Sequence, residues 1–411
     1  MIKIQDITVK KIFDSRGEPT IEVLLKAGNR WFSASVPSGK SRGSREAKVF
    51  PFSEAVRVLA RIRRAILKKD FSSIRALDNV LIRLDGTAKK SRLGGNLMLG
   101  ISVAFARARA AAENKEVWQI LRKEFFSGNS KTKIPLIFAN VINGGAHADN
   151  NLDIQEYMVV ARGGSVRARV ENLIDFYNRL GAILRKKNSG RRVPVGDEGG
   201  YSLDFKNNFE PIAVLENLVR VRGLAKNFSL ALDAAATGFY ARGLYAFGGK
   251  KLTSARLAGE YARYFGKSKL LFSIEDPFAE KDAAGFSLIH KKMPGAWVVG
   301  DDLTVTNSSE IKKYAEQNAI NAVIIKPNQI GTVSEAADAI LAAKQCGLKT
   351  IISHRSGETE DAFIIHLAKA SGADGVKIGA PTRERMIKYN ELMRLYPVTK
   401  ISTAAVGSLG Y

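Results

Sequence analysis

Six short apolar runs in the second half of the chain each end in one ionisable residue. The intervals between these residues are 42, 26, 25, 28 and 23 positions, and the residues are Asp233, Glu275, Asp301, Lys326, His354 and Lys377. Each interval has room for a strand, a helix and two loops, and helix-like segments such as 334–344 and 360–370 lie between the runs. The spacing therefore predicts a series of βα units.

A series of βα units that closes on itself forms a (β/α)8 barrel, whose catalytic groups gather at the carboxyl ends of the strands. A charged residue that ends a buried strand is costly unless it is paired or binds a ligand. We therefore expect the six residues to meet at one mouth. The predicted fold class is α/β, with a C-terminal (β/α)8-type barrel and an N-terminal α+β cap domain, an antiparallel meander plus helices.

The first third of the chain has a different pattern. Three β-rich runs, 2–13, 20–27 and 30–36, are separated by the turn sequences DSRGEP and GN, which predicts an antiparallel meander. Helical spacing follows over 56–66 and again over 96–112. A polar stretch, SGNSKTK, then suggests a boundary, so that the cap spans residues 1–130 and the catalytic barrel spans residues 131–411.

The chain is strongly basic. Its 411 residues include 64 Lys and Arg against 40 Asp and Glu, a net charge of +24. Residues 1–130 hold 26 of the basic and 12 of the acidic residues, so a net +14 lies in the predicted cap. Such a field attracts nucleic acid and other polyanions, or steers an anionic substrate. Composition alone does not choose between these partners.

From the sequence we expect neither a membrane span nor a secretory leader. The longest mostly apolar stretch, 96–106, ends at Arg107, whereas a spanning helix needs about 18 to 20 apolar residues. The first residues, MIKIQDITVKKIF, lack an apolar core followed by a cleavage site. The single cysteine, Cys346, cannot form an internal disulfide. We therefore expect a cytoplasmic protein with no membrane partner.

Three of the strand-end residues, Asp233, Glu275 and Asp301, are carboxylates. Like charges brought together at one mouth raise each other's pKa or require a cation. An all-oxygen set, without cysteine or a histidine pair, favours Mg²⁺ over Zn²⁺. The sequence therefore predicts a hard divalent metal at the mouth.

The next strand ends supply Lys326, His354 and Lys377, with Arg355 and Ser356 directly after the histidine. Metal on one side and cations on the other suit a small, highly anionic substrate that carries carboxylate or phosphate groups. We expect the surrounding positive charge to lower the pKa of Lys326, which would let this lysine act as a general base.

Eleven stretches of the chain, in this order, resemble the enolase family. They extend over more than 350 residues and read DSRGEPT, VPSGKSRGSREA, LDGTAKKSRLGGN, INGGAHADNNLDIQEYM, VGDEGG, ALDAAATGFY, SIEDPFAE, GDDLTVTN, IIKPNQIGT, ISHRSGETEDAF and VKIGAP. The resemblance implies a hydro-lyase of glycolysis and gluconeogenesis. Such an enzyme dehydrates 2-phospho-D-glycerate reversibly to phosphoenolpyruvate and water with the help of Mg²⁺.

The resemblance also implies two Mg²⁺ ions per active site. Asp233, Glu275 and Asp301 match the residues that bind the tighter ion, and Ser41 matches the loop residue that completes the second site. Lys326 matches the base that removes the proton from carbon 2 of the substrate.

The remaining roles follow from the same matches. Glu198 matches the acid that assists departure of the carbon-3 hydroxyl, and Glu156 matches its neighbouring carboxylate. Mutual repulsion of two such carboxyls keeps one of them protonated near neutral pH. The other matched residues are expected to face the substrate, with Arg355 and Ser356 on its phosphate and Lys377 on its carboxylate; they are His147, His354, Arg355, Ser356 and Lys377.

Some positions depart from the family pattern. Lys40 and Arg42 flank Ser41 where the family more often has small or neutral residues, and the segment after Glu46 is shortened. These cations sit beside the expected second metal. We expect them to affect metal affinity and loop closure rather than the type of reaction.

Two alternatives remain open on the sequence alone. One is a relative of the enolase superfamily that acts on a different carboxylate, although the SHRSGE segment argues against it. The other is a polyanion binder that keeps the enolase fold. No RNA-binding signature supports it, so we expect nucleic acid to bind non-specifically if at all. The resemblance favours a homodimer as the first expectation for the oligomeric state.

Overall fold

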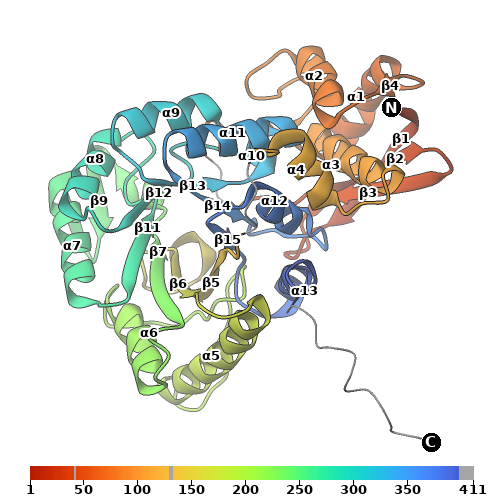
Figure 1. The fold of residues 1–411 in the computed structure, drawn as a ribbon. Coiled ribbons are helices and arrows are strands. Elements are labelled where there is room, and N and C mark those ends of the chain that lie inside the picture. Colours follow the sequence, from red (N-terminus) through yellow and green to blue (C-terminus); the bar gives the residue numbers. More distant parts are fainter. Residues whose placement is uncertain (41–42, 129–132, 398–411) are drawn as a thin grey trace, which may run out of the picture.

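A computed structural model describes residues 1–40, 43–128 and 133–397 of the chain. A small α+β cap, drawn in red to orange, lies beside a closed eight-stranded barrel that is surrounded by helices (Figure 1). This architecture confirms the predicted fold class. The predicted domain boundary at residue 130 lies outside the described residues.

The cap contains the predicted meander. Its sheet has the order β3-β2-β1-β4, and β1 pairs antiparallel with both β2 and β4. Buried Ile2 and Ile4 alternate with exposed Lys3 along β1, as expected for a sheet with one face on the core. The elements of the cap are β1 (Ile2–Phe13), β2 (Pro19–Ala27), β3 (Arg30–Ser35), β4 (Asp70–Phe71), α1 (Phe52–Ile66), α2 (Ile74–Asp85), α3 (Gly95–Ala112) and α4 (Val117–Phe125).

The barrel closes in the order β11-β12-β13-β14-β15-β5-β6-β7. Phe138, Met158, Val160 and Ile324 are among the buried side chains of its interior cluster, so it is packed rather than open. The strands are β5 (Leu136–Asn143), β6 (Glu156–Ala161), β7 (Phe228–Asp233), β11 (Leu271–Glu275), β12 (Trp297–Gly300), β13 (Ala322–Ile325), β14 (Lys349–Ser353) and β15 (Gly375–Lys377).

Helices cover the outside of the barrel (Figure 1). They are α5 (Val166–Lys187), α6 (Glu210–Val221), α7 (Ser254–Lys267), α8 (Ala283–Lys292), α9 (Ser308–Glu316), α11 (Val333–Gln345), α12 (Phe363–Ser371) and α13 (Met386–Leu395). The short α10 (Pro327–Ile330) instead follows β13 at the mouth and contacts the cap. A small antiparallel sheet of β8 (Tyr240–Ala241), β9 (Leu244–Phe247) and β10 (Lys250–Leu252) follows β7. No helix in the described part of the chain is long and apolar enough to cross a membrane.

One strand departs from a uniform βα series. β6 runs antiparallel to both of its neighbours, β5 and β7, and only a loop with a short 3-10 turn joins β5 to β6. Antiparallel neighbours need no crossover helix, whereas a parallel neighbour would. Because β6 is reversed, its first residue, Glu156, lies at the barrel end where the other strands finish.

Two cap side chains hold the amino end of the barrel helix α11. The Ser102 hydroxyl accepts a hydrogen bond from the Val333 amide at 3.1 Å, and the Asp78 carboxylate accepts one from the Ser334 amide at 2.9 Å. The first amides of a helix lack partners within the helix and favour negative charge nearby. Asp78 thus joins α2 of the cap to α11 of the barrel.

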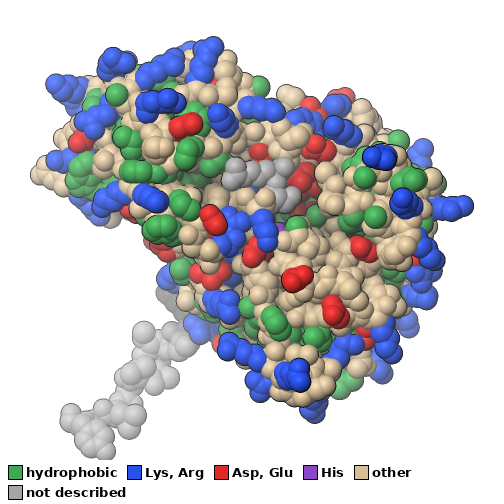
Figure 2. Space-filling view, turned by 180° about the vertical axis from the view of Figure 1, so that it is seen from behind, with side chains coloured by type: hydrophobic (Ala, Val, Ile, Leu, Met, Phe, Trp, Pro, Cys, Tyr) green, Lys and Arg blue, Asp and Glu red, His purple; other side chains and the backbone are tan. Residues whose placement is uncertain are grey.

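Basic side chains of the cap also reach acidic side chains of the barrel. The pairs across this junction are Arg45–Glu310, Arg75–Asp338, Lys90–Glu335 and Arg107–Asp361. Other cap cations, including Arg57, Arg61 and Arg64 on α1, are exposed, as the amphipathic pattern predicts. In Figure 2 the cap surface at upper left is rich in Lys and Arg, while acidic side chains lie along the cleft between cap and barrel.

The Asp78 contact leads to a prediction about stability. Burial raises the pKa of Asp78 from 3.8 to about 6, so the folded state binds this proton more tightly than the unfolded chain. The charged form therefore costs stability above pH 6, by about 3 kcal/mol for a shift of this size, and the cost is absent below about pH 4. We expect Asp78→Asn, which keeps an acceptor for the Ser334 amide, to raise the melting temperature at pH 7.5.

The gain should shrink as the pH falls from 6 to 4, as followed by thermal unfolding at several pH values. Asp70→Asn, at an exposed position of the cap, is the matched control. A gain that is equal at pH 4 and pH 7.5 would show that Asp78 is not the titrating group.

Candidate active site

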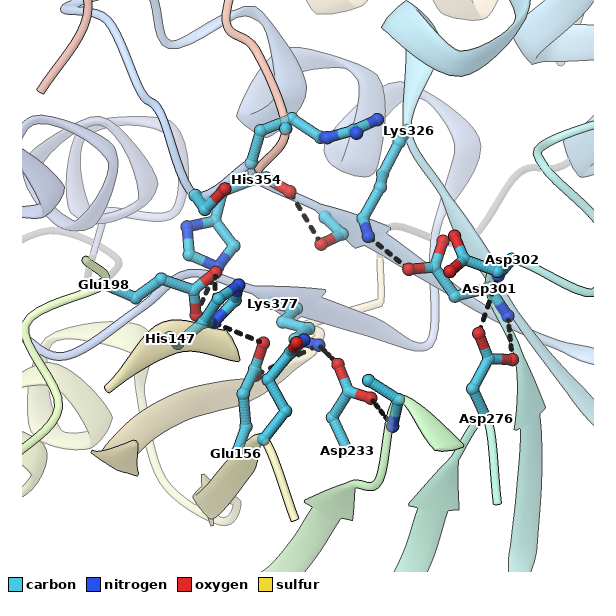
Figure 3. Close-up of a pocket in the computed structure, with 16 residues that line it drawn as sticks. His147, Glu156, Glu198, Asp233, Asp276, Asp301, Asp302, Lys326, His354 and Lys377 are labelled. Atoms are coloured by element: carbon cyan, nitrogen blue, oxygen red, sulfur yellow. Dashed lines mark hydrogen bonds and ion pairs between the residues drawn. The ribbon is translucent and has the colours of Figure 1, made fainter. Parts of the chain in front are cut away.

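The structure brings five of the six strand-end residues together in one pocket at the mouth of the barrel (Figure 3), and the sixth, Glu275, contacts Lys377 beneath it. Asp233, Glu275 and Lys377 are the last residues of β7, β11 and β15. The other members, Asp301, Lys326 and His354, directly follow β12, β13 and β14. The spacing argument therefore predicted the location of these side chains correctly.

Lys377 lies at the centre of the acidic part of the mouth. Its Nζ is 2.8 Å from Glu275 Oε2, 3.0 Å from Asp233 Oδ2 and 3.1 Å from Glu156 Oε2. Burial alone would lower the pKa of Lys377, but these carboxylates outweigh burial and raise it well above its ordinary value. Lys377 is thus an ammonium that offsets part of the negative charge of all three carboxylates.

The pKa expected for Lys326 was wrong. Its Nζ pairs directly with the Asp301 carboxylate. Burial, and the positive charges of Arg355 and Lys377, would lower the pKa of Lys326, but Asp301 and Glu275 raise it above its ordinary value. The sequence placed Lys326 among cations because His354, Arg355 and Lys377 follow it along the chain. In the fold, its nearest charged neighbour is an aspartate.

The residues predicted to bind metal have the chemistry of a hard-cation site. Asp233, Glu275 and Asp301 present only oxygens, and all three are buried. Glu275 Oε1 has no hydrogen-bond partner among the described residues, although it is fully shielded from solvent. Burial and then the charge of Asp233 raise the pKa of Glu275 well above its ordinary value. A divalent cation would relieve this repulsion and satisfy the unpaired oxygen.

A second acidic residue follows each of two strand-end carboxylates. Asp276 has a left-handed φ of 39°, and its two oxygens accept hydrogen bonds from the amides of Asp301 at 2.9 Å and Asp302 at 2.8 Å. Asp276 therefore braces the turn that carries Asp301. Asp276, Asp301 and Asp302 present oxygens within 4.8 Å of one another. The sequence signal for Asp276 and Asp302 was the second acidic residue in the motifs SIED and GDD. The prediction from strand ends did not use it.

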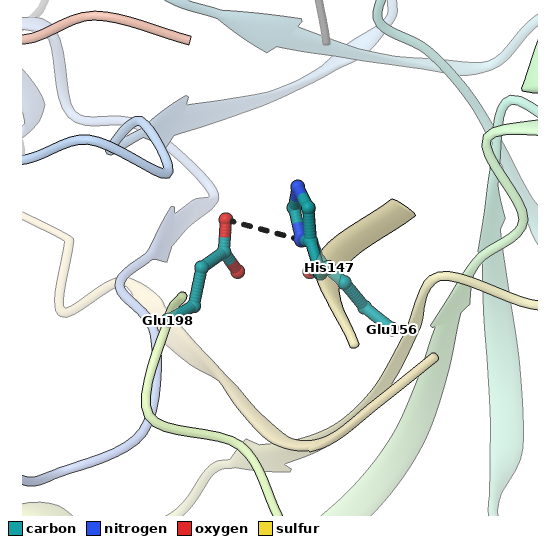
Figure 4. Close-up of side chains that lie close together, drawn as sticks. All are labelled: His147, Glu156 and Glu198. Atoms are coloured by element: carbon teal, nitrogen blue, oxygen red, sulfur yellow. Dashed lines mark ion pairs between the residues drawn. The ribbon is translucent and has the colours of Figure 1, made fainter. Parts of the chain in front are cut away.

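Glu156, Glu198 and His147 form a second cluster (Figure 4). His147 Nδ1 is 3.7 Å from Glu198 Oε1 and 3.9 Å from Glu156 Oε1. Burial and the charge of Glu198 raise the pKa of Glu156 well above its ordinary value. Burial opposes ionisation of Glu198, but His354, His147 and Lys377 lower its pKa. Of the two carboxyls, Glu156 is therefore the one that holds a proton more tightly, and Glu198 is the one that ionises more readily.

His354 is a neutral ring in this site. Burial lowers its pKa to about 4, despite the nearby charge of Glu198. Arg385 lies 2.9 Å from His354 Nδ1, and a guanidinium can only donate, so Nδ1 is the acceptor and the ring proton is on Nε2. Nε2 lies 3.5 Å from Glu198 Oε2. Asn140 also donates to that oxygen at 3.0 Å.

Arg355 and Ser356 lie where the cap meets the mouth. The backbone amide of Lys40, from the cap, donates to Ser356 Oγ at 2.8 Å. The Lys40 ammonium pairs with Asp197 at 3.1 Å, next to Glu198 in the chain. Ser41 and Arg42 lie outside the described residues. Lys40 therefore contacts two segments of the mouth, one through its backbone and one through its side chain.

Sequence reasoning missed other residues of the mouth. Arg385, Asn140, Gln329 and Glu46 touch predicted site residues but do not end an apolar run. Glu46 and Gln329 lie within the resemblance motifs SREA and KPNQ, and this was their only sequence signal. Taken together, the mouth presents carboxylates, two lysines and a buried arginine around a space for a small anion.

Comparison with known proteins identifies the family of the chain. A family model described as the enolase C-terminal TIM barrel domain matches residues 131–405, and one for the enolase N-terminal domain matches residues 4–121. The enolase of Methanocaldococcus jannaschii is 40% identical over 407 residues, which are 96% of this chain and 95% of the relative. The enolase of Thermococcus gammatolerans is 39% identical, over 96% of this chain and 94% of the relative. Enolase 1 of Lactococcus lactis is 39% identical, over 96% and 97% respectively. The chain belongs to the enolase family.

Proposed function

We propose that this chain catalyses the reversible dehydration of 2-phospho-D-glycerate to phosphoenolpyruvate and water, as a hydro-lyase of glycolysis and gluconeogenesis. The observation that carries the proposal is the arrangement of Lys326 and the Glu156–Glu198 pair on different sides of one pocket (Figure 3). Such an arrangement lets one side take a proton from carbon 2 while the other assists loss of the hydroxyl from carbon 3.

Lys326 is the proposed base. Its Nζ lies in the pocket and is held by Asp301, so it is oriented before substrate arrives. To accept a proton, Lys326 must first lose one, and the charge of Asp301 opposes that loss. When bound, Mg²⁺ would supply positive charge that stabilises the doubly charged carboxylate of the deprotonated substrate and draws the charge of Asp301 away from Lys326.

The Glu156–Glu198 pair is proposed to handle the proton on the other side. Glu198 is the expected acid, but Glu156 is the carboxyl of the pair whose pKa is raised, whereas that of Glu198 is lowered. His147 lies between 3.7 and 3.9 Å from the two carboxylates. The proposal is that a proton held by Glu156 passes to Glu198 within this cluster as the hydroxyl leaves. The neutral His354, with its Nε2 proton toward Glu198, helps to orient that carboxylate.

The remaining groups are proposed to bind the substrate. Arg355 and Ser356 would contact the phosphate, since a planar guanidinium matches phosphate oxygens. Lys377 would contact the substrate carboxylate, and His147 would lie over the substrate. Lys377 and Arg355 are both buried, which strengthens their interaction with an anion.

Asp233, Glu275 and Asp301 are proposed to hold the tighter of two Mg²⁺ ions, and Ser41 is proposed to take part in the second site. The all-oxygen donor set and the unpaired Glu275 oxygen support the first assignment.

We also propose a cytoplasmic homodimer. The net charge of +24 would steer the anionic substrate and product, with nucleic acid bound at most non-specifically.

Activity provides the first test. With 2-phosphoglycerate and Mg²⁺, the wild type should produce phosphoenolpyruvate, seen as rising ultraviolet absorbance. Lys326→Ala should lower turnover by about 10²- to 10⁴-fold, because a positioned base contributes that much. Lys250→Ala, at an exposed position outside the pocket, is the matched control. If Lys326→Ala kept activity close to that of the control, another group would have to be the base.

Metal binding provides a second test that does not depend on turnover. Glu275→Gln should weaken Mg²⁺ binding at least about 10-fold, because it removes a charged oxygen ligand. The measurement is calorimetric titration of the variant with MgCl₂, beside Glu316→Gln at an exposed position as control. Equal Mg²⁺ affinity in the two variants would remove Glu275 from the metal site.

A further inference from the structure

Glu46 of the cap lies buried against the mouth of the barrel. The residue is 8% exposed, and it lies between β3 and α1. Its Oε1 accepts hydrogen bonds from the Gly43 amide at 3.2 Å and from Gln329 Nε2 at 3.2 Å. A buried carboxylate is expensive unless it is paired and hydrogen-bonded. Its partners therefore indicate what the residue does.

The principal partner of Glu46 is Arg355, the residue proposed to bind the substrate phosphate. Glu46 Oε2 lies 3.1 Å from one terminal nitrogen of Arg355 and 3.2 Å from the other. Asn328 accepts from the guanidinium at 3.2 Å. A Cβ at Gly39 would lie 1.8 Å from the same guanidinium. The backbone of the cap therefore packs directly against one side of the Arg355 side chain. Arg355 is 4% exposed, and its guanidinium is held by Glu46 of the cap together with Asn328 of the barrel.

The second partner, Gln329, reaches the proposed metal and base residues. Its Nε2 donates both to Glu46 and, at 2.9 Å, to Asp301 Oδ1. Its Oε1 accepts from the Thr306 hydroxyl at 2.7 Å, and that hydroxyl accepts from the Lys326 amide at 2.9 Å. The Ala47 amide donates to the Gln329 carbonyl at 2.8 Å, which fixes this segment to the cap.

We propose that Glu46 is a positioning residue that sets Arg355 at a fixed place relative to Asp301 and Lys326, through Gln329. The inference rests on the proposed function. The substrate must place its phosphate at Arg355 and its carbon-2 proton at Lys326 at the same time. An error of about 1 Å in such a placement can cost about 10²-fold in rate.

The contacts argue against a role for Glu46 as a metal ligand or as a source of charge alone. Donors from Gly43, Gln329 and Arg355 already occupy the lone-pair directions of both oxygens. If charge were its only role, a shorter carboxylate at the same place would serve as well. If position is its role, the length of the side chain matters.

Two variants separate these roles. Glu46→Asp keeps the charge but shortens the side chain, so a positioning role predicts that kcat falls about 10- to 100-fold. Glu46→Gln removes a negative charge beside Arg355, so inorganic phosphate should bind at least as tightly as in the wild type while kcat falls by a similar factor. Glu54→Gln, a cap carboxylate on α1, is the control and should leave kcat unchanged.

The measurements are steady-state kinetics, calorimetric titration with inorganic phosphate, and thermal unfolding to show that the variants are folded. A Glu46→Asp variant with kcat within twofold of the wild type would overturn the proposal. If Glu46→Asp does not fold, the kcat of Gln329→Met tests the proposal instead. This variant leaves the Glu46–Arg355 pair in place, and unchanged kcat would again overturn the proposal. A wild type that does not convert 2-phosphoglycerate would instead refute the proposed function.

Discussion

The mouth of the barrel depends on one electrostatic problem, the burial of several carboxylates within a few ångströms of one another. Lys377 offsets much of this negative charge, because its ammonium contacts Asp233, Glu275 and Glu156 together. Lys326 does the same for Asp301. Without these cations, the carboxylates would have to bind protons, or their mutual repulsion would destabilise the folded site. The same charges prepare the mouth for divalent metal and for an anionic substrate.

The fold explains part of the excess positive charge of the cap. Arg45, Arg75, Lys90 and Arg107 pair with acidic residues of the barrel, and Lys40 reaches Asp197. In the opposite sense, Glu46 of the cap pairs with Arg355 of the barrel. Part of the positive charge of the cap therefore serves the junction between the two parts. The pairs made by Lys40, Arg45 and Arg75 are partly exposed and contribute little stability each, whereas the Glu46–Arg355 pair is buried.

Sequence reasoning predicted the elements that depend on local pattern. The period of the βα units placed Asp233, Glu275 and Asp301 at one mouth, and turn residues predicted the meander of the cap. The reversed strand β6 was not predicted from the pattern, and Glu156 was found only through its motif. The pairing of Lys326 with Asp301 and the contacts of Glu46 were missed, because they join residues that are distant along the chain. Periodicity predicts where a strand ends, whereas the partner of its last residue depends on tertiary packing.

The mouth of the barrel is proposed to interconvert 2-phosphoglycerate and phosphoenolpyruvate. Phosphorus NMR of the wild type with Mg²⁺ tests this proposal most directly, since the two compounds have separate signals and the reaction can be started from either. We expect both starting compounds to reach the same final mixture, and we expect addition of EDTA at the outset to prevent the change. Spectra that stay unchanged from both starting compounds, with folded protein and Mg²⁺ present, would show that the mouth does not carry out this reaction.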